Sequence, residues 1–171
     1  MIVQACALPA QAMLRGYSSG GGYTDCFVIE TAARVSLARY VEAFYTNWLF
    51  KLERRVLTLA ARPSSDLQAV ELAAGNGSAF AAWEVESRAA DQLLMRDITG
   101  RTRSWFMVVP TAGGTRLYFG SAITATRHST SGPATIGPVF QALVGIHELY
   151  SRALLATARG RLQRLAELVN L

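Results

Sequence analysis

The sequence is short of charge, cysteine and histidine, and it has no long apolar run. Charged residues make up 17% of its 171 residues, whereas hydrophobic residues make up 51%. This balance allows a buried core and excludes an intrinsically disordered protein. No run reaches the roughly 18 apolar residues that a membrane span needs, and no Lys or Arg precedes the apolar start. We therefore expect neither a membrane span nor a signal peptide, and the length fits one domain.

Lysine is almost absent, although basic residues outnumber acidic ones by 17 to 12. Lys51 is the only lysine, so arginine carries the formal net charge of +5. The arginines are spread along the chain and no aromatic-rich basic motif accompanies them. Codon usage in a GC-rich genome explains this excess better than binding to an anion or a nucleic acid. We expect no nucleic-acid partner and no membrane partner.

Motifs for metals, cofactors and disulfides are also missing. Cys6 and Cys26 are too few for a disulfide framework and predict reduced thiols in a cytoplasmic protein. His128 and His147 stand alone, without a cysteine pair or an H-E-x-x-H motif, so we predict no metal site. No glycine pattern for phosphates or dinucleotides is present, and we predict no cofactor. The G-x-S-x-G match at 16–20 lacks the strand and helix of a nucleophile elbow.

A glycine-rich stretch divides the chain. Residues 18–22 read Ser-Ser-Gly-Gly-Gly, the composition of a flexible linker. We therefore expect residues 1–22 to form an N-terminal tail or linker and residues 23–171 to form a single domain.

Apolar spacing and turn signals predict the elements of this domain. The first two are a strand at 23–30 and a helix or helix pair at 37–56, with Ser36 as N-cap and an interruption at Thr46-Asn47. They are followed by strands at 68–74, 79–87, 91–97, 102–109 and 115–126 and by a helix at 138–168. Asn76-Gly77 is the strongest hairpin signal in the chain. Strands joined this closely must be antiparallel. The prediction is an α+β fold with the order β-αα-β5-α, in which about six to seven strands form a curved sheet against a long C-terminal helix.

Hairpin loops of the expected lengths sort the strand residues onto two faces. The expected pairs are Val70 with Trp83, Leu72 with Ala81, Val85 with Leu93, Trp83 with Met95, Leu93 with Phe106, Met95 with Ser104, Val108 with Leu117, and Phe106 with Phe119. This face is predicted to be buried. The other face carries charges together with Leu94, Trp105, Met107 and Tyr118. Such an apolar patch on a solvent face is either a homodimer contact or a set of ordinary exposed residues.

Several polar residues share the face that we expect to be buried. Ser104 and Ser121 would be cross-strand neighbours, and His147 and Tyr150 lie in the apolar stripe of the last helix. Asp25, Asp91 and Asp97 share the same face near the strand ends. A buried polar group without a partner costs roughly 1–3 kcal/mol. These groups therefore either form Ser–Ser and His–Tyr pairs inside a solid core or line a cavity and orient a ligand.

The order of elements resembles the helix-grip fold of the START-like (SRPBCC) superfamily, over about residues 23–168. The segments YTDCF at 23–27, DQLLMRDITGRTRSW at 91–105 and TRLYFGSA at 115–122 are similar to an uncharacterised bacterial family of this type. Helix-grip proteins normally have seven strands, one more than the sequence predicts. The resemblance implies a cavity for apolar small molecules, sometimes with lyase, cyclase or hydrolase chemistry. It carries no shared catalytic motif, so no residue role is transferred.

The leading hypothesis is a protein that binds an apolar or aromatic small molecule between the sheet and the C-terminal helix. The predicted ligand-binding residues are Trp83, Met95, Ser104, Phe106, Phe119, Ser121, His147 and Tyr150. One alternative is a cofactor-independent enzyme that uses His147, an acid or base at neutral pH, with Asp97 or another of the three aspartates. The other is a ligand-free homodimer that associates through Trp105, Met107 and Tyr118. The sequence leaves open whether any reaction is catalysed.

Overall fold

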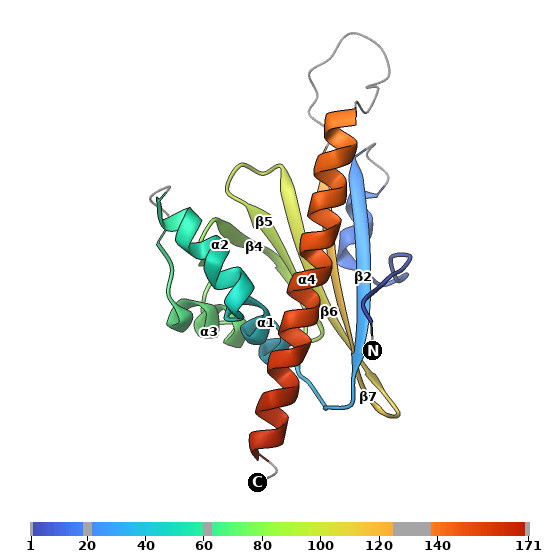
Figure 1. Ribbon diagram of the computed structural model, residues 1–171, viewed down its shortest axis with the longest axis vertical. Helices are drawn as coiled ribbons and strands as arrows, with labels where there is room; N and C mark the ends of the chain where they lie inside the picture. Colours follow the sequence, from blue (N-terminus) through green and yellow to red (C-terminus); the bar gives the residue numbers. More distant parts are fainter. Residues whose placement is uncertain (1, 19–21, 60–62, 125–137, 170–171) are drawn as a thin grey trace.

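The computed structural model describes residues 2–18, 22–59, 63–124 and 138–169. They form an antiparallel sheet with the strand order β1-β2-β7-β6-β5-β4-β3 and a long C-terminal helix (Figure 1). The elements are β1 (Gln4–Ala5), the 3-10 helix η1 (Met13–Tyr17), β2 (Tyr23–Thr31), α1 (Leu37–Tyr45), α2 (Trp48–Leu59), α3 (Asp66–Ala74), β3 (Ala79–Phe80), β4 (Trp83–Arg88), β5 (Gln92–Asp97), β6 (Thr102–Thr111), β7 (Gly114–Ile123) and α4 (Pro138–Val169). The predicted α+β class, with a curved sheet and a C-terminal helix, is confirmed. The end of the strand predicted at 115–126 lies outside the described residues.

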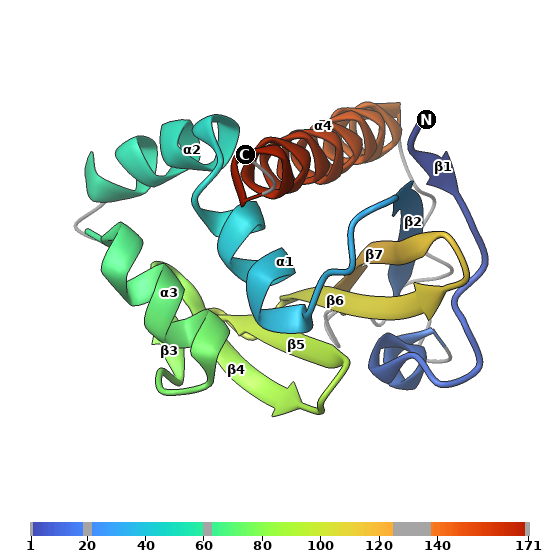
Figure 2. The same cartoon turned by 90° about the horizontal axis from the view of Figure 1, so that it is seen from below.

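The sheet separates two layers of unequal thickness. Helices α1 and α4 lie on its inner face, whereas η1 lies on its outer face (Figure 2). The main core fills the inner layer and joins residues of β2, α1 and β5–β7 to Leu154, Leu155, Ala158 and Leu162 of α4. A second cluster fills the outer layer around Trp105. Both faces of the central strands are therefore buried.

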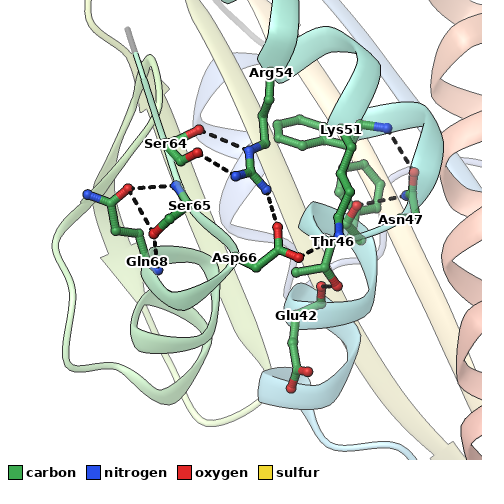
Figure 3. Close-up of polar contacts among 11 residues, drawn as sticks. Glu42, Thr46, Asn47, Lys51, Arg54, Ser64, Ser65, Asp66 and Gln68 are labelled. Carbon is green, nitrogen blue, oxygen red and sulfur yellow. Dashed lines mark hydrogen bonds and ion pairs between the residues drawn. The ribbon is translucent and has the colours of Figure 1, made fainter. Parts of the chain in front are cut away.

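The predicted break at Thr46-Asn47 separates α1 from α2, as expected. Asn47 turns the chain because its side chain donates to Phe44 O (2.7 Å) and accepts from Phe50 N (2.8 Å). The Thr46 hydroxyl donates to Glu42 O (2.6 Å) and so occupies a carbonyl at the end of α1 (Figure 3). These bonds let Phe44 and Phe50 approach each other with ring centroids 6.3 Å apart. Two short helices thus present their aromatic side chains to one region of the core.

The segment predicted as a strand at 68–74 is a helix, α3, and this prediction is wrong. Ser65 and Gln68 form a capping box at its start, and Gly75 ends it in the left-handed region at φ 89°. The amides of Asn76 and Gly77 both donate to Glu71 O, so Asn76-Gly77 closes a helix and does not join a hairpin. The local caps therefore outweigh the alternating pattern that suggested a strand.

Two of the expected cross-strand pairs disappear with this strand. Val70 cannot pair with Trp83, nor Leu72 with Ala81, because both partners from the first segment lie on α3. Val70 is 38% exposed, whereas Leu72 is fully buried against the core from the helix. The observed order of elements is therefore a strand, three helices, five strands and a helix, after the N-terminal β1 and η1.

Helix α3 is fastened to α2 through Asp66. The Asp66 carboxylate lies 2.5 Å from Lys51 Nζ and 2.5 Å from Arg54 Nη1 (Figure 3). Arg54 also donates to the hydroxyl (3.0 Å) and the carbonyl (2.5 Å) of Ser64, just before the helix begins. An acidic residue in the first turn of a helix is further favoured by the helix dipole. These contacts hold α2 against the start of α3.

The register of the central strands agrees with the expected one. Leu93 pairs with Phe106 and Met95 with Ser104, and the predicted pairs between β6 and β7 are also observed. Between β4 and β5 the expected register is wrong by two residues, because Val85 pairs with Met95 and Trp83 with Asp97. An irregularity between Val85 and Ser87 accompanies this shift. A shift of two residues keeps Trp83 and Val85 on the buried face. Beyond the irregularity the alternation changes, because Ser87 lies opposite Leu94 and Arg88 opposite Leu93.

The apolar patch that we expected on a solvent face is covered by the chain's own N-terminal residues. Trp105 and Met107 are fully buried, and Leu94 and Tyr118 are 4% and 9% exposed. Leu14 of η1, itself fully buried, packs on this face above Gly120, where an added Cβ would lie 3.0 Å from the Leu14 side chain. The predicted exposure of Trp105, Met107 and Tyr118 is therefore wrong, and these side chains are not available for a homodimer contact in this structure. Residues 2–18, expected to form a tail, lie along the sheet instead.

Gln92 joins the N-terminal cover, residues 2–18, to the sheet through hydrogen bonds. Its Oε1 accepts from Trp105 Nε1 (2.9 Å) and from the backbone amide of Met13 (3.0 Å). Its Nε2 donates to Gln11 O (3.0 Å). One buried amide therefore satisfies the indole of Trp105 and two backbone groups of the N-terminal segment. Met13 and Gln11 lie 79 and 81 positions from Gln92, and no short-range pattern indicates these two bonds.

Candidate functional site

A cavity of about 300 Å³ lies between the inner face of the sheet and the helices α1, α2 and α4. Aromatic and aliphatic residues line it together with about as many polar ones, and such a mixture of apolar surface and polar groups is found in small-molecule sites. The lining residues are Phe44, Tyr45, Phe50, Glu53, Ala82, Trp83, Asp97, Thr102, Ser104, Phe119, Ser121, His147, Tyr150, Ser151 and Leu154. An open recess therefore remains at this end of the core, between β7 and the N-terminal half of α4.

Most of the predicted ligand-binding residues lie at this cavity. Trp83, Ser104, Phe119, Ser121, His147 and Tyr150 line it, as does Asp97. Met95 and Phe106 are fully buried and are not among the lining residues. The Phe106 ring lies behind the wall, with its centroid 4.8 Å from that of Phe44 and 5.3 Å from that of Phe119. Met95 and Phe106 therefore support the lining residues from behind and do not face the cavity.

Sequence reasoning missed the contribution of α1 and α2. Phe44, Tyr45, Phe50 and Glu53 line the cavity, although only their helical spacing was visible in the sequence. The break at Thr46-Asn47 was the sequence signal that could have indicated these lining residues, because two helices meeting at an angle turn several aromatic residues toward one region. The direction of that turn depends on contacts with α3 and the sheet.

Three buried polar atoms at the cavity lack a hydrogen-bond partner among the described residues. They are Tyr45 Oη, Ser121 Oγ and His147 Nε2. Only one further such atom, Arg161 Nε, is found in the described part of the chain, and Arg161 does not line the cavity. Unpaired buried polar atoms are rare in native proteins and cost roughly 1–3 kcal/mol each. Their concentration around one cavity marks the place where a water molecule or a polar group of a ligand would complete the hydrogen bonding.

The expected Ser–Ser and His–Tyr pairs do not form among the described residues. Ser104 and Ser121 are opposite each other in the register, but Ser121 Oγ is one of the unpaired atoms. Tyr150 donates its hydroxyl proton to Glu53 of α2 and not to His147. The observed contacts thus favour the alternative in which these groups line a cavity.

Glu53 places an acid in the helical wall of the cavity. Burial raises the pKa of its carboxyl above the usual value of 4.5, and the hydrogen bond from Tyr150 partly offsets this. Burial also raises the pKa of Tyr150, with the neighbouring Glu53 adding to the effect. The Tyr150 proton therefore stays on the phenol at neutral pH and remains available to Glu53.

Replacing Glu53 with glutamine is expected to raise the free energy of unfolding at pH 7. Because the folded pKa lies above 4.5, the folded state binds more protons than the unfolded state, and ionisation costs stability as pH rises from 4.5 through the folded pKa. Glutamine avoids this cost and still accepts from Tyr150. Urea unfolding at pH 7 and pH 4 measures the difference, which should vanish at pH 4. A loss of stability confined to pH 7 would contradict this account.

His147 lies beside an aspartate at the edge of the cavity. Its Nε2 is 3.3 Å from Asp25 Oδ2, although the geometry does not meet that of a hydrogen bond between the described groups. The Asp25 side chain is only 6% exposed, and its Oδ1 accepts from the Ser121 amide (2.7 Å). The Tyr23 hydroxyl lies 3.2 Å from Asp25 Oδ2 and 3.0 Å from Glu148 Oε1. Asp25 is therefore the aspartate that the fold brings to His147.

The other two candidate aspartates have different surroundings. Asp97 lines the cavity, but its carboxylate accepts from the amides of Arg101 (2.8 Å) and Thr102 (2.9 Å) and from the Thr99 hydroxyl (2.5 Å). It therefore holds the turn between β5 and β6, and these bonds occupy the carboxylate that we proposed for catalysis. Asp91 is exposed at the opposite end of β5 and does not line the cavity.

The described residues contain no group of three or more His, Cys, Asp or Glu side chains that would hold a metal ion. His128 lies outside these residues. Across the same described ranges, every helix is too short or too polar to cross a membrane. In comparisons with known proteins, no family model matches the chain and no curated protein matches it significantly. Any functional conclusion therefore rests on the geometry of the site.

Proposed function

We propose that the protein binds a small apolar or aromatic molecule in the cavity between the sheet and α4. The observation that carries this proposal is the set of three buried polar atoms, on Tyr45, Ser121 and His147, that have no hydrogen-bond partner among the described residues and lie beside the aromatic lining residues. A ligand with an apolar body and one or two polar substituents would satisfy both features, because each polar substituent could pair with one of these atoms. The cavity volume of about 300 Å³ suits a small ring system.

The architecture supports the same proposal. A curved antiparallel sheet packed on a C-terminal helix is the arrangement of the helix-grip fold, and we propose membership of the START-like superfamily on that basis. The cavity lies where that resemblance predicts one. We also retain a cytoplasmic location as part of the proposal, consistent with Cys6 and Cys26 being free thiols.

A fluorescence titration with the neutral apolar probe N-phenyl-1-naphthylamine tests this function. Binding in an apolar cavity should raise the probe fluorescence in a saturable way with a stoichiometry near one. The purified protein should first be unfolded and refolded to remove any molecule that it carries. Non-saturable fluorescence, or fluorescence that the cavity-filling variant Ser121→Leu leaves unchanged, would count against binding at this cavity.

Replacing Ser121 with alanine should separate stability from binding. The Ser121 hydroxyl has no partner among the described residues, so its removal should leave the free energy of unfolding unchanged or raise it by up to about 1 kcal/mol. Affinity for a ligand that hydrogen-bonds to this hydroxyl should fall roughly fivefold to tenfold. Urea unfolding and a titration with 1-naphthol, which carries one hydroxyl, measure the two effects. A clear loss of stability would mean that the hydroxyl is paired inside a solid core.

A second function is favoured by one specific observation, the 3.3 Å approach of His147 Nε2 to the buried Asp25. A histidine beside a carboxylate can act as a general acid or base toward a bound molecule. We propose this catalytic alternative for ligands that carry an exchangeable proton. If a molecule co-purifies, incubating it with fresh protein and following its mass tests the alternative. Conversion by the wild type that is lost in His147→Gln supports catalysis, and an unchanged molecule supports binding alone.

A further inference from the structure

The two cysteines of the chain lie against each other on the outer face of the sheet, and neither lines the cavity. Cys6 Sγ is 3.2 Å from Cys26 Sγ. Continuing the β1–β2 register, in which Ala5 pairs with Phe27, sets Cys6 opposite Cys26, and the Cys6 amide donates to Cys26 O (2.9 Å). Residues directly opposite in an antiparallel pair have Cα atoms about 4.5–5.5 Å apart, within the range that a disulfide spans. The backbone therefore already has the spacing that a bond between these sulfurs requires.

The chain between the two cysteines contains the described residues 7–18, which cover the outer face of the sheet. Residues 7–25 include η1, whose Leu14 is fully buried against that face. The segment is joined to the sheet by the Gln92 bonds and by the short β1–β2 ladder. A covalent link at the base of this loop would restrict its detachment from Trp105.

The two thiols differ in access and ionisation. Cys6 is half-buried and lines two hollows of the surface. Cys26 lines one of them but is only 4% exposed. The hydrogen bond with Cys26 lowers the pKa of Cys6, and the Arg116 charge adds to this. The same contact, together with burial, raises the pKa of Cys26. Cys6 is therefore the thiol that a reagent meets first, and Cys26 is the one that acts second.

We propose that Cys6 and Cys26 form an intramolecular disulfide when the protein meets a low-molecular-weight disulfide, and that the bond fastens the N-terminal segment to the sheet. The Cys6 thiolate attacks one sulfur of the oxidant, forming a mixed disulfide and releasing the first thiol. Cys26 then loses its proton to solvent and attacks Cys6 Sγ, which releases the second thiol. In sum, two protein thiols are oxidised to one disulfide, and one oxidant disulfide is reduced to two thiols.

Oxidised glutathione is the reagent for the test. After incubation with excess reagent, the intact mass of the wild type should fall by two hydrogen atoms, with no glutathione attached and no free thiol remaining. Arg15 is the only trypsin site between the two cysteines. Cleavage there should leave two fragments that stay joined until a reductant is added. The thermal midpoint should rise by roughly 6–12 °C, as expected for closing a loop of this length.

Single variants assign the roles of the two thiols. Cys26→Ser should stop at the mixed disulfide and carry one glutathione on Cys6. Cys6→Ser should react far more slowly, because Cys26 is buried. The wild-type measurements decide the proposal even if a variant does not fold. Two free thiols after prolonged incubation, a stable glutathione adduct on wild-type Cys6, or disulfide-linked dimers would each overturn bond formation. An intramolecular bond that leaves the thermal midpoint unchanged would overturn the fastening role.

Discussion

Replacing Trp105 with alanine should lower the free energy of unfolding by about 3–5 kcal/mol. Trp105 is fully buried between the sheet and the N-terminal segment, and it is the largest such side chain in the described part of the protein. The substitution removes this apolar volume and also leaves Gln92 Oε1 without its indole donor. Both losses loosen the cover, because Gln92 joins the sheet to Met13 and Gln11.

Urea unfolding of the variant and the wild type measures this loss. Trp48, which is 66% exposed at the start of α2, provides a matched control, and Trp48→Ala should change the free energy of unfolding by less than about 0.5 kcal/mol. A loss below about 1 kcal/mol for Trp105→Ala would mean that Trp105 faces solvent. That result would restore the exposed patch and the homodimer contact that the sequence suggested.

Filling the cavity with Ser121→Leu should reduce probe affinity at least about a hundredfold without destabilising the fold. Ser121 lies on β7 with its side chain at the cavity, and its hydroxyl has no partner to lose among the described residues. A leucine side chain inserted into a packed core would cost about 1–3 kcal/mol. Inserted into an empty space, it gains apolar burial instead, so the free energy of unfolding should stay constant or rise.

The same titration and unfolding experiments measure both effects. Ser87 is exposed on β4 and lies outside the cavity lining, so Ser87→Leu is the matched control and should leave the affinity unchanged. A destabilised Ser121→Leu variant would indicate a core that is already filled. A stable variant that binds the probe as tightly as the wild type would move the binding site elsewhere.

The sequence predicted the inner face of the sheet well because tight hairpins leave few registers. The pairs of Phe106 with Leu93 and Phe119 follow from loop length alone, and they are observed. The error in the register at Val85 left the predicted face of that residue unchanged, since a shift of two residues preserves the face. Local rules thus suffice where neighbouring strands are also neighbours in sequence.

Two further predictions were wrong. One depended on competing local signals for helix and strand, and the other depended on contacts between residues far apart in the sequence. The segment around Val70 and Leu72 alternates like a strand, but caps at Ser65 and Gly75 stabilise a helix. The outer face looked exposed because its cover comes from residues 79 positions away, as in the bond from Met13 to Gln92. A linker composition at 18–22 concealed that the preceding residues are apolar enough to pack.

The site was predicted in part for the same reasons. Strand alternation assigned Ser104, Ser121 and the three aspartates to one face, and helical spacing assigned His147 to it. Of the three aspartates, Asp97 is the one among the lining residues. Parity does not measure distance along a strand, so it could not select Asp25 from Asp91 and Asp97. The contacts of α2, including the Glu53–Tyr150 bond, depend on how the helices pack and have no local signal.

Native mass spectrometry of freshly purified protein, compared with the same sample after denaturation, tests the hollow core most directly. We expect a fraction of the native protein to carry one small apolar molecule, which is released on unfolding and is absent from Ser121→Leu. Refolded protein, once stripped, should take up 1-naphthol with a stoichiometry of one. A native mass equal to that of the bare chain, together with no uptake of 1-naphthol, would contradict the account and indicate a core that holds no ligand.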